Sequence, residues 1–291
     1  MMAGTQAIKS RISTVESIRK ITHAMELVAA SKLRRARIEF ENVKAYNEVI
    51  KETFRSILNH LSPTEIKHLF PIHNIESRMF IIVTSDLGLA GSYNSNIIKF
   101  AKNTIKKTDK VILIGRKAIS SLASLYENQI VTQFNCDSSE KDYNIVHDIM
   151  TIVFELYNRK QVNSINVIYN KYMNNLVQQE TCDQVFPFKF DEDKKQKHAE
   201  KHKESLNSII EFEPSAQQVL SESIPLFIDA ELYLAYTSAK LSEMAARRSA
   251  MESATDNADE LIDNLNLEFN RKRQSSITQE LNEIVAGADA V

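Results

Sequence analysis

Two glycines, Gly88 and Gly91, lie in a turn-like segment between an apolar run and a helical pattern, where a phosphate-binding loop could form. Such loops cradle a phosphate with backbone N–H groups, and they carry either the G-x-G-x-x-G spacing or a terminal Gly-Lys-Ser/Thr. The segment Gly-Leu-Ala-Gly-Ser-Tyr has neither pattern, so it lacks the lysine that reaches a β- or γ-phosphate. We therefore expect a tight turn, with Asp86 as a turn or helix-capping residue rather than a catalyst.

A metal site is the next chemistry to consider. His198 and His202 are four residues apart, a spacing that can place two ligands on one helix face. No cysteine lies near them, and the surrounding residues 191–204 are charged and low in complexity, which is typical of a solvated loop. Cys136 and Cys182 are too few for a disulfide framework and favour a reducing compartment. We expect neither a metal nor a cofactor.

Two polar runs could bind a partner. Residues 32–37 read Lys-Leu-Arg-Arg-Ala-Arg, which allows a solvated face, a docking patch for an acidic protein loop or a nucleic-acid contact. The net charge of −2 and the absence of interleaved aromatic residues argue against nucleic acid. The run N-R-K-R-Q-S-S-I-T-Q-E at residues 270–280 lies inside a helical pattern where a core helix would carry leucines.

The helix breakers indicate which elements hold these runs. The chain has five glycines and five prolines, with none between Gly4 and Pro63 and none between Pro225 and Gly287. Because glycine and proline are absent from both end segments and concentrated in the middle, we expect two very long helices that flank a mixed central domain. We accordingly divide the chain into an N-terminal helix (1–62), a central domain (63–215) and a C-terminal helix (216–291).

Apolar residues recur at helical spacings of three, four and seven in both end segments. At about 1.5 Å per residue, the first helix is roughly 75–80 Å long, and this length exceeds the diameter of a globular domain of this mass. It therefore needs a partner helix. Alanines in both segments and their opposite net charges favour a thin, long antiparallel coiled coil of the two helices.

The middle of the chain alternates strand and helix patterns, which predicts a Rossmann-like α/β domain with a largely parallel sheet. A helix is expected at 141–158, and a shorter one at 116–126. The predicted strands cover residues 78–84, 110–115, 129–134 (an edge strand), 164–172 and 176–190, the last two forming a pair joined at 173–175.

Four stretches resemble the gamma subunit of F-type ATP synthases. They are I-R-K-I-T-H-A-M-E-L-V-A-A-S-K-L-R-R-A (18–36), T-S-D-L-G-L-A-G (84–91), A-T-D-N-A-D-E-L-I (254–262) and N-R-K-R-Q-S-S-I-T-Q-E-L-N-E-I-V (270–285). They occur at both ends and in the centre, in the order of the family. The absence of a transit-peptide pattern favours a bacterial source.

The resemblance implies a rotating central shaft that couples ion flow through the membrane c ring to ATP synthesis or hydrolysis by the alpha and beta subunits. It implies a non-catalytic subunit that also binds epsilon and lies peripherally on the cytoplasmic side of the cell inner membrane. No run of about eighteen apolar residues is present, so direct membrane insertion is not expected.

The resemblance also assigns contacts to particular positions. It implies that the catch loop of beta binds Arg273, Gln274, Thr278 and Glu280 in the polar run, and that the acidic lever of beta lies near Met25, Lys32, Arg34 and Arg35 in the helix neck. It also implies that Phe212 and Glu213 form a foot that contacts the c ring, and that a hydrophobic sleeve holds the terminal tip at Ile284 and Val285.

Two other functions stay open from the residues alone. One is a structural adaptor that recruits an acidic partner through residues 32–37. The other is a nucleotide-binding enzyme built on the central domain. Assembly of an ATPase-competent complex with alpha and beta subunits and one copy of this chain distinguishes a rotor from the first. ATP binding by the isolated chain at micromolar concentration tests the second.

Overall fold

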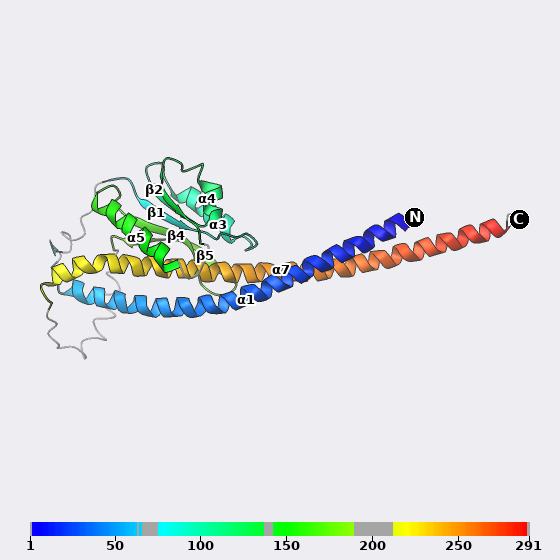
Figure 1. Ribbon diagram of the computed structural model, residues 1–291, viewed down its shortest axis with the longest axis horizontal. Coiled ribbons are helices and arrows are strands. Elements are labelled where there is room, and N and C mark those ends of the chain that lie inside the picture. Colours follow the sequence, from blue (N-terminus) through cyan, green and yellow to red (C-terminus); the bar gives the residue numbers. More distant parts are fainter. Residues whose placement is uncertain (1, 63, 66–74, 137–141, 189–211, 290–291) are drawn as a thin grey trace. The chain divides into compact units, whose positions relative to one another are not determined.

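The structure is a computed structural model that describes residues 2–62, 64–65, 75–136, 142–188 and 212–289 (Figure 1). They form two compact units, one of residues 1–32 with 247–291 and one of residues 33–246. Both long helices, α1 (Met2–Asn59) and α7 (Ala216–Asp289), contribute to each unit. None of the described helices has a stretch apolar and long enough to span a membrane. The three-part division of the chain at residues 62 and 215 stays a prediction.

The long helices confirm the prediction from the helix breakers. α1 has 58 residues and α7 has 74. Pro225 lies within α7, which continues through it. Pro225 lies past the first turn of the helix, so α7 lacks the hydrogen bond that this position would make to the carbonyl four residues earlier.

A five-stranded sheet forms the centre of the 33–246 unit, with the order β3-β2-β1-β4-β5. The first four strands of that order run parallel, and β5 pairs antiparallel with β4. The predicted α/β class and strand pair are confirmed, although β5 begins two residues later than expected. The strands are β1 (Met79–Val83), β2 (Lys110–Ile114), β3 (Ile130–Phe134), β4 (Ile165–Tyr172) and β5 (Gln178–Phe186).

Helices cover both faces of this sheet, which explains why β1 and β2 are continuous apolar runs. On one face α3 (Tyr93–Thr104) and α4 (Arg116–Leu122) pack over Phe80, Ile82 and Leu113. On the other face α5 (Asp142–Asn158) and the inner parts of α1 and α7 pack over Ile81 and Ile112. The long helices therefore share the core of the α/β domain.

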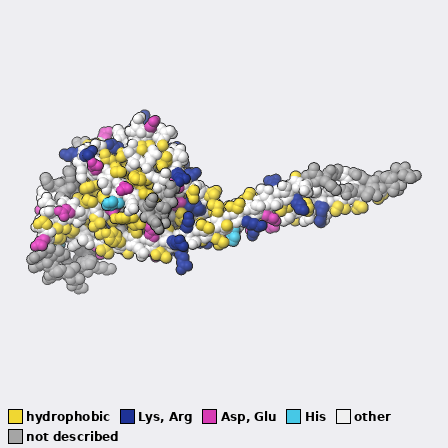
Figure 2. All heavy atoms as spheres, viewed as in Figure 1, with side chains coloured by type: hydrophobic (Ala, Val, Ile, Leu, Met, Phe, Trp, Pro, Cys, Tyr) yellow, Lys and Arg dark blue, Asp and Glu magenta, His cyan; other side chains and the backbone are white. Residues whose placement is uncertain are grey.

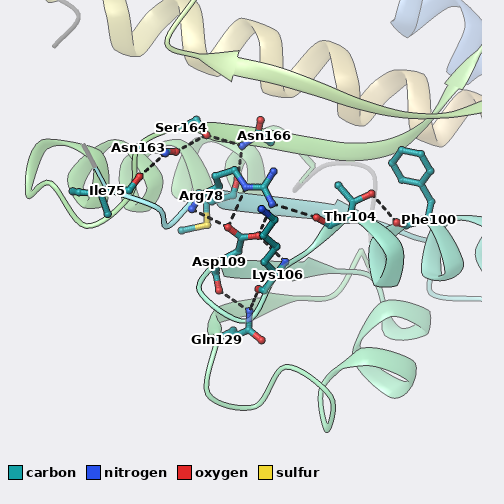
Figure 3. Close-up of polar contacts among 11 residues, drawn as sticks. Ile75, Arg78, Phe100, Thr104, Lys106, Asp109, Gln129, Asn163, Ser164 and Asn166 are labelled. Atoms are coloured by element: carbon teal, nitrogen blue, oxygen red, sulfur yellow. Dashed lines mark hydrogen bonds and ion pairs between the residues drawn. The ribbon is translucent and has the colours of Figure 1, made fainter. Parts of the chain in front are cut away.

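A buried ion pair joins the starts of β1 and β2 (Figure 3). The Asp109 side chain is fully buried, and its two carboxylate oxygens accept hydrogen bonds from Arg78 Nε at 3.1 Å and Nη2 at 2.8 Å. Backbone N–H groups of Arg78 and Lys106 donate to the same carboxylate. The Gln129 amide donates to the carbonyls of Lys106 and Asp109, both at 2.7 Å. This network fixes the starts of β1, β2 and β3 relative to one another.

At the other end of these strands, the close approach of the segments that follow β1 and β2 depends on Gly115. Gly115 has a φ of +95°, and a Cβ there would lie 2.3 Å from the backbone oxygen of Thr84. The close approach lets the Thr84 hydroxyl accept from the Ala118 N–H at 2.9 Å, which helps start α4. At Gly88, by contrast, a Cβ would meet only the end of the Lys117 side chain, at 3.7 Å.

We predict that Asp109→Ala lowers the free energy of unfolding by about 3 kcal/mol, because the half-buried Arg78 guanidinium and the backbone N–H groups of Arg78 and Lys106 all lose their acceptor. Urea denaturation measures the loss. The matched control is Glu155→Ala, which breaks an exposed ion pair with Arg159 and should change stability by less than about 1 kcal/mol. Equal stability of the two variants would contradict the structural role of Asp109.

We also predict that Gly115→Ala lowers the melting temperature strongly, since positive φ alone costs about 1–3 kcal/mol and the Cβ clash adds to it. Gly88→Ala is the control and should melt close to the parent. Calorimetry of both variants checks this, and a parent-like melting temperature for Gly115→Ala would show that the turn relaxes freely.

Candidate partner-binding surfaces

The first unit is an antiparallel pair of helices. Ile8 and Val15 of α1 are buried against Leu265 and Ala258 of α7, so residue numbers fall along α7 as they rise along α1. The arrangement confirms the predicted antiparallel coiled coil. Small and polar residues continue the seam: the hydroxyls of Thr22 and Thr255 lie 2.9 Å apart, Arg19 pairs with Asp259, and Ala29 is buried. The seam is thin, and much apolar surface stays outside it.

Part of that surface lies on the outer side of α1. Ile18, Ile21 and Val28 are exposed, and Met25 between them is half-buried. Their spacings of three and four residues place them on one helix face. Figure 2 shows hydrophobic side chains beside Lys and Arg on the surface of this helix pair. Lys32, also exposed, follows this stripe at the next turn.

The end of α7 carries an exposed apolar stripe. No residue after Phe269 whose side chain the structure describes is buried. Ile277, Leu281 and Val285 recur every four residues and are 50%, 56% and 60% exposed. In Figure 1 this end of α7 (red) runs beyond the start of α1 (blue). A helix segment with an uncovered apolar stripe needs a partner in order to bury it.

The predicted catch-loop residues lie on this same uncovered segment. Arg273, Gln274 and Thr278 are all exposed, and the Thr278 hydroxyl donates to the Gln274 carbonyl at 3.0 Å. The side chains of Glu280 and Ile284, both predicted contacts, lie outside the described residues. The polar run and the apolar stripe therefore occupy one stretch of helix, as the sequence indicated.

The basic cluster at residues 32–37 divides in the structure. Arg34 and Arg35 are exposed. Arg37 instead donates from Nη2 to the Tyr172 hydroxyl and to Asn175 Oδ1, both at 2.7 Å. The sequence pattern places Arg37 in the docking patch, and this is wrong: Arg37 is an internal clamp between α1 and the loop after β4.

The two predicted foot residues differ in exposure. Phe212 is half-buried and packs edge-on against the His60 ring, with ring centroids 5.2 Å apart. Its neighbour Glu213 is exposed. Of the two, Glu213 is the side chain that a partner can reach, and Phe212 supports the chain where it enters α7.

A buried polar cluster that the sequence did not reveal joins α7 to α5. Asp142 accepts hydrogen bonds from the Tyr236 hydroxyl at 2.9 Å and from Lys240 Nζ at 2.8 Å. Burial disfavours the charged ammonium, but Asp142 outweighs that effect and raises the pKa of Lys240. Burial also raises the pKa of the nearby Cys136 thiol to about 11, so this thiol is protonated and unreactive at neutral pH.

In a doubly wound sheet, ligands bind outside the carboxyl ends of the strands at the switch point, which here lies between β1 and β4. At this point α7 is hydrogen-bonded to the elements around β1 and β4. Asn170 donates to the Tyr93 carbonyl at 3.0 Å, the Tyr93 hydroxyl donates to the Ala239 carbonyl at 3.0 Å, and the Tyr172 N–H donates to the Ser238 hydroxyl. The usual nucleotide position is therefore occupied by the chain itself.

The segment at 84–91 has the structural role that we expected. Asp86 Oδ1 accepts the backbone N–H of Arg116 at 2.8 Å and so caps α4. Gly91 has a positive φ, and so does Leu89. Among the described residues no group of three His, Cys, Asp or Glu side chains is arranged to hold a metal, and His198 and His202 lie outside those residues.

Comparison with known proteins identifies the family. A family model described as ATP synthase matches residues 4–291. The ATP synthase gamma chain of Mycoplasmopsis agalactiae is 47% identical over 291 residues, covering all of both chains. The gamma chain of Mycoplasmopsis synoviae is 43% identical over 97% of each chain, and that of Alkaliphilus metalliredigens 36% identical over all of each.

Solved structures share the fold at low identity. A chain of the Euglena gracilis mitochondrial ATP synthase rotor matches with a TM-score of 0.63 and 17% identity, covering 95% of this chain and all of that one. A chain of the Tetrahymena thermophila central stalk and c ring matches with a TM-score of 0.60 and 21% identity, covering 80% and 99%. With full-length relatives well above 30% identity, this chain belongs to the ATP synthase gamma-chain family.

Proposed function

We propose that this chain is the rotating central shaft of an F-type ATP synthase and carries no catalytic residue of its own. The observation that supports this most is the uncovered end of α7. A single helix in water is marginally stable, and this one also exposes an apolar stripe. A surrounding ring of alpha and beta subunits would bury that stripe and leave the chemistry to its own nucleotide sites.

The helix pair is asymmetric, and the coupling mechanism uses that asymmetry. α1 carries an apolar stripe that ends at Lys32, the exposed residues Arg34 and Arg35 follow it in the chain, and the last turns of α7 carry the polar run. A threefold-like ring around such a shaft presents each catalytic site with a different face. Each site then takes a different affinity for nucleotide, because contacts that differ between conformations shift their populations. Rotation moves these affinities from site to site.

The proposed contacts follow the uncovered surfaces. Arg273, Gln274, Thr278 and Glu280 bind a catalytic subunit, and Ile284 and Val285 form the tip held by an apolar sleeve. Met25, Lys32, Arg34 and Arg35 face an acidic segment of the head. Glu213, supported by Phe212, faces the c ring, and the epsilon subunit binds the same stalk. The complex is peripheral to the cell inner membrane on its cytoplasmic side.

Reconstitution tests this function directly. The chain is mixed with alpha and beta subunits of the same organism, and the product is separated by size and assayed for ATP hydrolysis. We expect an active complex that contains one copy of this chain. If the three proteins stay apart, or if the complex forms with several copies of the chain, the rotor function is wrong.

We predict that Arg273→Ala combined with Gln274→Ala lowers ATP turnover of the reconstituted complex about tenfold or more, since two charge-assisted or polar contacts of about 1 kcal/mol or more are lost. Helicity of the free chain should stay unchanged, because both side chains are exposed. Lys99→Ala, an exposed cation on α3, is the control and should keep full turnover. A large loss of helicity in the double variant would indicate a structural role instead.

We further predict that Ile277→Ser with Leu281→Ser weakens assembly with the head while leaving the unfolding of the free chain within about 0.5 kcal/mol of the parent. Burial of a large aliphatic side chain is worth about 1.5–3 kcal/mol, so the apparent affinity should fall about tenfold or more. Size-exclusion titration measures it. Parent-like affinity would mean that this stripe stays in water in the complex.

A further inference from the structure

The loop between β4 and β5 exposes apolar side chains to an unusual degree. Leu176 is 83% exposed, and Met173 and Val177 are 54% and 53% exposed. We call these three residues the apolar prong. A hairpin loop normally carries polar or turn-forming residues, because its side chains face water. Three large apolar side chains at a hairpin tip instead mark a contact surface.

The prong is held in a fixed geometry. The backbone N–H groups of Leu176 and Val177 both donate to Asn174 Oδ1, at 2.9 Å and 2.8 Å. The N–H groups of Met173 and Asn174 donate to the Val177 carbonyl, at 3.3 Å and 3.2 Å. The loop therefore satisfies its own backbone, and the exposure of its apolar side chains does not come from a lack of local structure.

Both long helices hold this hairpin. Arg37 of α1 donates to the hydroxyl of Tyr172, the last residue of β4, and to Asn175 within the loop. The Phe40 ring packs edge-on against the Tyr172 ring, with centroids 6.4 Å apart. Ser238 of α7 accepts the Tyr172 backbone N–H at 3.1 Å. In Figure 1 the loop after β4 reaches α1. A force on the prong is thus transmitted to α1 and α7 within the same unit.

Two exposed cations lie on the elements that hold the prong. Arg34 lies one turn before Arg37 on the same side of α1, and Lys171 directly precedes Tyr172; both are exposed. Glu41, one turn beyond Arg37, is the acidic residue of that helix side. An apolar tip with a cationic margin fits an apolar pocket that has carboxylates at its rim, because rim charges set orientation while the buried centre supplies affinity.

We propose that the apolar prong docks into an acid-rimmed apolar pocket on an alpha or beta subunit of the catalytic head. The inference rests on the proposed function and adds a contact outside the two long helices. A protein pocket is favoured over a lipid surface, because shape-complementary docking needs the fixed loop that Asn174 and Arg37 provide. Insertion into lipid would gain nothing from that geometry.

Site-specific photocrosslinking tests the docking. Leu176 is replaced by benzoylphenylalanine in the full chain, and the complex with alpha and beta subunits is assembled, isolated and irradiated. The control probe replaces Leu125, which is 56% exposed and follows α4. Probe 176 is expected to crosslink to alpha or beta peptides that contain Asp or Glu, and probe 125 is not.

The outcomes separate the inference from the proposed function. If the isolated complex forms and probe 176 gives no crosslink to the head, the prong assignment is wrong while the rotor function stands. The assignment is also wrong if, with phosphatidylglycerol vesicles present, probe 176 labels lipid rather than subunits. If no complex forms with any chain, the unmodified one included, the rotor function and the docking both fail.

Substitutions give a second, independent readout. Met173→Ser with Leu176→Ser should weaken the apparent affinity of the chain for the alpha–beta mixture about tenfold, from lost burial of two side chains. Arg37→Ala keeps the three prong residues but removes the side chain that holds the loop, so it should also weaken the affinity. Arg37→Lys should weaken it as well, because lysine lacks the forked donor. Leu125→Ser is the control. The proposal would be overturned if the Met173→Ser, Leu176→Ser double variant and the Arg37→Ala variant both bound within twofold of the parent affinity.

Discussion

The structure depends on one constraint: every turn of a long amphipathic helix must bury its apolar side. α7 meets this requirement in two successive ways and then, in its last segment, leaves its apolar side exposed. Residues 216–246 pack on the sheet and α5, where Ile228, Tyr236 and Ala239 are buried. Residues 247–269 pack against α1 through Ala258 and Leu265. In residues 270–289 no side chain that the structure describes is buried, although Ile277 and Leu281 continue the apolar pattern.

That progression from covered to uncovered helix relates the fold to the proposed work. The inner part of α7 is fixed by a sheet, by Asp142 and by Lys240, so the α/β domain grips the shaft where torque would enter. The outer part is a thin pair with Thr22, Ala29 and Thr255 in its seam. Small seam residues bury little area, which leaves apolar and polar surface free for a surrounding ring.

Much of this architecture could be predicted from the sequence, because it follows from local patterns. The absence of Gly and Pro located both long helices, and apolar β-branched runs located the strands of the sheet. Contacts between segments far apart in the chain could not be predicted. Arg37 looks like any other cation of its cluster until the hairpin brings Asn175 within 2.7 Å. Likewise, the Gly88–Gly91 turn resembles a ligand site, and only packing places Ala239 over the crevice. The pattern at 176–190 predicts a strand that begins at Leu176, although an apolar residue so close to a turn could also indicate an exposed loop tip.

The most direct measurement is hydrogen–deuterium exchange along α7 in the free chain and in the complex with alpha and beta subunits. Uncovered helix opens easily, and burial raises the cost of opening. The account predicts fast exchange at residues 270–285 in the free chain and exchange about a hundredfold slower in the complex, with residues 228–246 protected in both. Equal exchange of 270–285 in the two states would contradict the claim that a partner covers the end of the shaft.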